Sequence, residues 1–192
     1  SVEDLKNAKQ PVRIGIVGVG SAEFPRGVIL GEVIGFPYTF VSGYSGSTAT
    51  LTGVARGDSD FANFNPSSSR SFVESGDLIP LFVFGDPERD PMFPDVPTSS
   101  EIGLPDDLGD LSGVMRFIFA PPDMPQPVAK YMSDLVATVL ADPDFVAWAK
   151  AAKRPIDPAG PEAAAAAVKG WETTYGRYAD AIMAEVKKLG GS

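Results

Sequence analysis

Residues 41–60 read VSGYSGSTATLTGVARGDSD, and this stretch decides the fold. It starts at the end of an apolar strand, passes through a glycine and serine turn, and enters a helix expected from Ser47 to Ala55. Gly57 then makes a tight turn before a new strand that starts at Asp60. A strand, a helix and a strand joined by short turns are typical of a parallel sheet with helices on its faces.

The same alternation extends over the first half of the chain. Strands are expected at 12–17, 38–41, 60–64 and 78–84, and helices at 1–8, 24–34, 47–55 and 67–75. A proline-rich stretch follows, and then a further strand is expected at 114–120. The remainder is predicted to be helical, and its last helix runs from Pro161 to Gly190. The elements predict an α/β fold with a mostly parallel sheet, in which 1–112 form the α/β part and 113–192 form a strand plus C-terminal helices.

Composition excludes several classes of function. The chain has 192 residues and a net charge of −9, which argues against nucleic acid or an anionic membrane surface as the main partner. It contains no cysteine and no histidine, so disulfides, thiolate metal sites, cysteine nucleophiles and histidine-based triads are ruled out. No metal and no cofactor are expected.

The sequence offers no signal for a membrane segment. No stretch approaches the ~20 apolar residues of a membrane span. The first residues have neither the basic nor the apolar region of a signal peptide, and a mature exported protein whose leader has been removed would look the same.

Two turns carry the main functional prediction. Ser45, Gly46 and Ser47 are residue types that leave backbone N–H groups bare at a helix start, where the helix dipole also favours an anion. A second turn, Gly18–Ser21, follows the preceding strand and is equally small and polar. Because both turns lie at the carboxyl edge of one parallel sheet, we expect them to form one wall of a cleft for a small carboxylate.

Other interpretations of these turns remain open. The Gly18-x-Gly20 pair suggests a dinucleotide loop, but Glu23 breaks the glycine pattern and no acid ends the second strand. Each turn can also be a tight connection or a simple helix cap without a ligand. The aromatic stripe of the last helix is interpreted as core packing.

Three further polar residues are candidate ligand contacts, and simpler structural roles are also open to them. Tyr44 stands in the second turn, and Asp60 is either a solvated acid or a polar anchor for a donor group of the ligand. Asn65 follows the third strand, where helix capping is the simpler role. The complete set of predicted ligand-binding residues is Gly20, Ser21, Tyr44, Ser45, Gly46, Ser47, Asp60 and Asn65.

Four segments together resemble the substrate-binding receptors of tripartite tricarboxylate transporters, the Bug receptors. They are Val2–Leu5 with Ile14–Ser21, Gly43–Gly46 with Gly57–Asp60, Arg89 with Pro94–Gly103, and Phe119–Pro125 with Asp142–Phe145. The run Pro94-Asp95-Val96-Pro97-Thr98 is the most specific of these, whereas the glycine turns alone are weak. Ser42-Gly43 departs from a valine–proline pair that is common in the family.

The resemblance implies a periplasmic receptor with a two-lobed clamp that closes on a carboxylate. The chain would be its second periplasmic-binding-protein-like lobe plus a C-terminal helical return segment, without the first lobe. The part of the ligand-binding site on this second lobe would include Ser21, Tyr44, Ser47 and Asp60. The implied partners are a small organic acid and the membrane components of a transporter, and a homodimer is expected if the first lobe is missing.

The sequence therefore predicts a solute-binding receptor for a small carboxylate and not an enzyme. One alternative is a non-catalytic assembly or dimerisation module derived from such a receptor. The other is a small α/β enzyme that uses Asp60 and Tyr44.

Overall fold

The computed structural model describes residues 1–84, 88–106, 108, 117–152, 154 and 156–190. These residues form two compact units, one made of 1–113 with 171–192 and the other of 114–170. The first unit contains α1 (Val2–Lys6), β1 (Val12–Gly15), α2 (Glu23–Ile34), β2 (Tyr38–Val41), α3 (Ser47–Arg56), β3 (Phe61–Ala62), α4 (Pro66–Glu74) and α8 (Ala179–Gly190). The second contains α5 (Gln126–Leu140) and α6 (Pro143–Ala151), and α7 (Pro161–Arg177) begins in the second unit and ends in the first.

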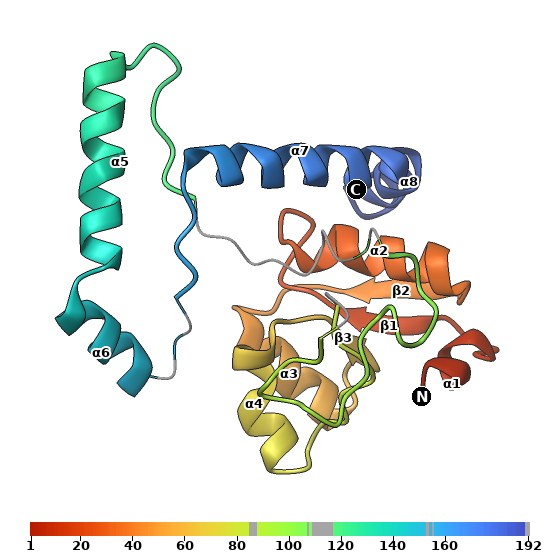
Figure 1. The fold of residues 1–192 in the computed structure, drawn as a ribbon. Coiled ribbons are helices and arrows are strands. Elements are labelled where there is room, and N and C mark those ends of the chain that lie inside the picture. The colour runs from red at the N-terminus through yellow and green to blue at the C-terminus, as the bar shows by residue number, and fades with distance from the viewer. Residues whose placement is uncertain (85–87, 107, 109–116, 153, 155, 191–192) are drawn as a thin grey trace. The chain divides into compact units, whose positions relative to one another are not determined.

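The first unit is built on a parallel sheet with the strand order β2-β1-β3. Ile14 of the central strand is paired with Phe40 on one side and Phe61 on the other. The chain moves in opposite directions across the sheet through α2 and α3, so right-handed crossovers place these helices on opposite faces. Figure 1 shows α2 and α8 over one face and α3 and α4 over the other. The predicted α/β class with a parallel sheet and flanking helices is confirmed.

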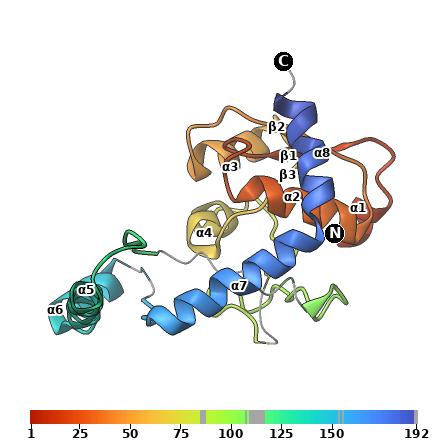
Figure 2. The same cartoon turned by 90° about the horizontal axis from the view of Figure 1, so that it is seen from above.

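The core lies between β1 and α2. Ile14 and Ile16 are fully buried, as are Val28, Ile29 and Leu30 of α2. Partly buried side chains of α8, among them Ile182 and Val186, pack against this cluster. Figure 2 shows α8 running across α2. Burial of this apolar surface fixes the sheet, and the sheet in turn fixes where the polar turns at its edge lie.

Glycine at position 31 is required by close packing. A Cβ atom there would lie 2.1 Å from Cδ1 of Tyr38, so only glycine lets the tyrosine ring lie flat on α2. Gly35 ends the same helix in the left-handed region with φ 83°, as the sequence predicts for a stop at this position.

Several predicted elements differ from the structure. The strand expected at 78–84 is wrong: only Val83 forms a parallel bridge, and its partner is Thr98 in the proline-rich run. Pro80 supplies no N–H to a ladder, which explains why pairing does not extend. The strand expected at 114–120 falls in part on 114–116, which lie outside the described residues, and 117–120 are not in a strand. The helix expected from Pro161 onward is broken at Tyr178 into α7 and α8.

The first compact unit combines two separate stretches of the chain, 1–113 and 171–192. The second of these stretches contains α8, which packs against α2. The assignment of 1–112 to a second lobe and of 113–192 to a return segment stays a prediction. In the part of the chain that the structure describes, none of the helices has the length and apolar composition needed to cross a membrane.

Candidate functional site

The first turn, between β1 and α2, is held by its own serine. The backbone N–H of Ser21 donates to the carbonyl of Gly18 at 2.9 Å, and the Ser21 hydroxyl donates to the same carbonyl at 2.7 Å. The residue that precedes α2 is Ala22, whose side chain has no acceptor for the first-turn N–H groups. The start of α2 is therefore left without a side-chain cap from its N-cap residue.

The second turn, between β2 and α3, has the same property. Gly46 precedes α3 with φ 157° and has no side chain to cap the helix. Its carbonyl accepts the N–H of Thr50 at 3.0 Å, so the helix begins at Ser47 with bare N–H groups in its first turn. The N–H of Gly43 donates to the carbonyl of Val17 at 3.4 Å, which joins the second turn to the first.

The third turn, before α4, is closed differently. The Asn65 carbonyl oxygen Oδ1 accepts the N–H of Ser68 at 2.9 Å and the hydroxyl of Ser67 at 2.8 Å. Asn65 thus caps its own helix, which is the simpler of the two roles open to it from the sequence. Among the three turns, only α2 and α3 lack a capping side chain at the N-cap.

A buried asparagine ties the end of β3 to the start of α2. The Asn63 side chain is 8% exposed, and its amide nitrogen Nδ2 donates to the carbonyl of Glu23 at 3.0 Å. This hydrogen bond fixes the beginning of α2 against the neighbouring strand end.

Asp60 lies away from these turns. It immediately precedes β3 and stands beside Arg13 on β1, at the amino edge of the sheet. Its carboxylate accepts the Arg13 backbone N–H at 2.9 Å and the guanidinium at 3.0 and 2.6 Å. Hydrogen bonds from Arg13 hold the pKa of Asp60 below its usual range. The structure therefore does not bring Asp60 to Ser21 or Ser47 at the carboxyl edge.

Tyr44 lies along α3. A Cβ atom on Gly53 would lie 2.6 Å from the Tyr44 hydroxyl, so the ring rests on the helix backbone where that helix has no side chain. Within the described residues, the buried hydroxyl has no hydrogen-bond partner. Tyr44 thus positions the second turn against its helix.

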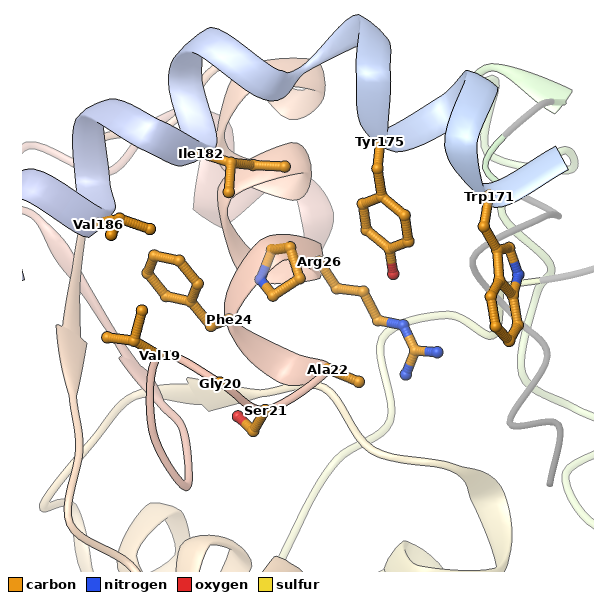
Figure 3. Close-up of a pocket in the computed structure, with 11 residues that line it drawn as sticks. Val19, Gly20, Ser21, Ala22, Phe24, Arg26, Trp171, Tyr175, Ile182 and Val186 are labelled. Atoms are coloured by element: carbon orange, nitrogen blue, oxygen red, sulfur yellow. The ribbon is translucent and has the colours of Figure 1, made fainter. Parts of the chain in front are cut away.

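A pocket of about 410 Å³ opens beside the first turn. Its lining residues are Val19, Gly20, Ser21, Ala22, Phe24, Pro25, Arg26, Trp171, Tyr175, Ile182 and Val186. Figure 3 shows Ser21 at its edge and the Arg26 side chain extending through it below Tyr175. Of the predicted site residues, Gly20 and Ser21 line this pocket. An anion-binding site that they share with Ser45–Ser47 stays a prediction.

Sequence reasoning predicted only Gly20 and Ser21 among the lining residues and missed, among others, the two aromatic residues of α7 and an arginine. Trp171 and Tyr175 were interpreted as core, and Tyr175 does pack against the core while also facing the pocket. Arg26 was not singled out, although a lone basic residue just after the Gly-x-Gly-Ser turn is a signal for an anion. Over the described residues, no group of acidic side chains gathers in a way that could hold a metal ion.

No protein-family model matches the chain. A protein of Agrobacterium vitis, the UPF0065 protein in the TAR-I ttuE-ttuC′ intergenic region, is 29% identical over 139 residues, which are 72% of this chain and 39% of that protein. The chain is therefore similar to a UPF0065 protein. The resemblance to Bug receptors seen in the sequence is thereby confirmed, and the chain spans well under half the length of this relative.

Solved structures agree on the fold. R. palustris Rpa4515 with adipate superposes with a TM-score of 0.65 at 18% identity, over 94% of this chain and 59% of that one. The structure of a periplasmic transporter gives a TM-score of 0.62 at 19% identity, over 91% and 57% of the two chains. The expected periplasmic-binding-protein-like fold is confirmed. None of these proteins is described as an enzyme.

Proposed function

We propose that this chain is the solute-binding part of an extracytoplasmic receptor that captures a small carboxylate for a tripartite tricarboxylate-type transporter. The observation that carries the proposal is the pair of adjacent helix starts, α2 and α3, that lack a side-chain cap at one edge of the sheet. Backbone N–H groups and the helix dipole make such a place suited to an anion. The similarity to a UPF0065 protein and the likeness to an adipate complex support the same class of ligand.

Binding without catalysis fits the side chains at this edge. The turns supply N–H donors and the hydroxyls of Ser45 and Ser47, which hold an anion but do not transfer protons near neutral pH. In such a receptor, closure of two lobes around the ligand is read by the membrane components. A periplasmic location accompanies this proposal, supported by the likeness to the structure of a periplasmic transporter.

Thermal unfolding in the presence of carboxylates tests the proposal. Succinate, adipate, citrate and benzoate would be added to the purified chain, with the matching amides as uncharged controls. A bound ligand at one hundred times its dissociation constant stabilises a protein by ~2.7 kcal/mol, which raises the melting temperature measurably. An unchanged melting temperature with every acid at millimolar concentration would contradict the proposal.

One substitution removes a donor without breaking the helix. Proline is tolerated at the first position of a helix, so Ser47→Pro should fold while deleting one N–H of the anion-binding site. We expect it to abolish the carboxylate-induced shift. Ser47→Ala, which keeps the N–H and loses only the hydroxyl, is the matched control and should retain part of the shift.

A further inference from the structure

The pocket beside the first turn is divided into an apolar and a polar end. Figure 3 shows Val19, Phe24 and Val186 together at one end, and Arg26, Tyr175 and Trp171 toward the other. All of its lining residues belong to the first compact unit, so the pocket is defined within a single part of the chain. Its volume of about 410 Å³ falls within the usual range for small-molecule sites.

The charge of the lining selects the sign of a ligand. None of the lining residues is acidic and one, Arg26, is basic, in a chain whose net charge is −9. The start of α2, which has no side-chain cap from its N-cap residue, lies on the same pocket wall. A guanidinium with several N–H donors suits a carboxylate, and a cation would find no counter-charge among these side chains.

The remaining lining selects the body of the ligand. Tyr175 and Trp171 present aromatic rings, and Ile182 adds aliphatic surface, whereas Phe24 is buried in the core behind them. Aromatic side chains favour a second ring through stacked or edge-on contacts in addition to simple burial. A short polar diacid would leave this surface uncovered.

We infer that this pocket binds a carboxylate with an aryl body, its ring beside Tyr175 and Ile182 and its carboxylate near Arg26 and the start of α2. The inference rests on the proposed function and narrows its ligand class. It adds Arg26, Tyr175 and Trp171 to the residues that determine specificity, none of which is among the predicted ligand-binding residues.

The two tryptophans allow a direct test. Trp148 is 55% exposed on α6, outside the pocket, so Trp148→Phe leaves Trp171 as the single tryptophan. The emission of Trp171 in this otherwise complete chain would be followed during titration with 3-phenylpropanoate. The comparison probes are 3-phenylpropylamine, which has the same body and the opposite charge, and succinate, which has the charge without the ring.

The expected result is a saturable change in Trp171 emission with 3-phenylpropanoate, at a dissociation constant at least tenfold below those of both comparison probes. Equal or tighter binding of succinate, or of the amine, would overturn the inference. A melting-temperature shift with succinate but no Trp171 response to 3-phenylpropanoate would overturn it while leaving the proposed function standing. No response to any carboxylate by either readout would contradict both.

Variants of the lining give a second test. Arg26→Gln removes the charge with little change in shape and should weaken 3-phenylpropanoate at least tenfold. Val19→Asp places an acid at a site that is 37% exposed, where the fold tolerates a polar residue, and should weaken it similarly. Val146→Asp on α6, at a position 45% exposed and outside the pocket, is the matched control and should leave affinity unchanged. Unaltered affinity in a folded Val19→Asp variant would count against the inference even if Arg26→Gln does not fold.

Discussion

Arg13 and Asp60 show how a residue with an expected role in binding serves the fold. The guanidinium of Arg13 donates to both carboxylate oxygens of Asp60 and also to the carbonyls of Gly57 and Asp58. These contacts fasten the turn after α3 to the start of β1. The sequence does indicate this position, because a residue that begins a parallel strand lies at the amino edge, whereas ligands bind at the carboxyl edge.

The lowered pKa of Asp60 gives a pH-dependent prediction. A carboxyl group whose pKa is lower in the folded state stabilises the protein above its unfolded pKa of about 3.9, and the contribution is lost as pH falls through the folded value. Asp60→Asn should therefore lower the free energy of unfolding near neutral pH. The difference from wild type should shrink below about pH 4. Urea unfolding measured across this range checks the prediction.

An exposed pair on α4 is the control for this experiment. Glu74→Gln makes the same change of acid to amide in the Arg70–Glu74 pair, whose side chains are 34% and 60% exposed. Such surface pairs contribute only ~0.3–0.5 kcal/mol. If the two variants gave parallel and equally small differences at every pH, the Arg13–Asp60 lock would be contradicted.

Gly31 makes a prediction about packing. Gly31→Ala would place a methyl group 2.1 Å from the Tyr38 ring. Overpacking of this kind costs ~1–3 kcal/mol of stability, which is more than alanine gains over glycine through its higher helix propensity. Gly176→Ala in α7 has open space around its Cβ position and should not destabilise the protein. Chemical denaturation of both variants compares them. Equal stability of the two would show that the ring has room to move.

Individual elements could be predicted where local signals agree. β2 at Tyr38–Val41 and α3 from Ser47 match the sequence analysis because glycine and serine bound both. The predicted strand at 78–84 was wrong because its apolar composition outweighed Pro80, and the partner of Val83 comes from a proline run that carries no strand signal. The break at Tyr178 interrupts a continuous apolar stripe, which periodicity alone does not reveal.

The cap of α4 is an element-scale prediction. Asn65 accepts the Ser68 N–H and its loss should destabilise the helix, so Asn65→Ala should reduce the free energy of unfolding by ~1 kcal/mol. Ser71→Ala, at an exposed position in the same helix, is the control and should be neutral or slightly stabilising. Carboxylate binding should be unaffected by Asn65→Ala if that residue serves only as a cap. A large loss of carboxylate binding without a loss of stability would instead show that Asn65 is a ligand-binding residue.

At the scale of the whole molecule, the two units differ in how much they bury. Among the described residues of 114–170, Ala149 is the buried hydrophobic side chain, while Val128, Met132, Leu135 and Val139 on α5 are 43–49% exposed. The first unit holds a continuous apolar core on both sides of β1 and α2. Stability is therefore expected to be uneven along the chain.

Hydrogen exchange followed by mass spectrometry tests this difference. Peptides from α5 and α6 should exchange much faster than peptides from β1 and α2, because their backbone hydrogen bonds are covered by fewer buried side chains. Comparable protection in both sets would mean that 126–151 are stabilised by contacts beyond those described.

The candidate site could be predicted only in part. The chain order of strands and turns places Gly20, Ser21 and Ser45–Ser47 at the same edge, because that placement follows from the parallel topology. The pocket could not be predicted, because Trp171 and Tyr175 reach it from a helix far away in sequence. Long-range packing of this kind leaves no periodic signal near the turn.

The central claim is that uncapped N–H groups at the starts of α2 and α3 bind a carboxylate. Amide proton and nitrogen chemical shifts of the labelled chain, recorded during titration with adipate, test it most directly. The account predicts saturable shifts that are largest at Gly20–Ala22 and at Ser45–Thr48, with the capped start of α4 unchanged. Shifts that stay small at both turns, or that concentrate at α4, would contradict it.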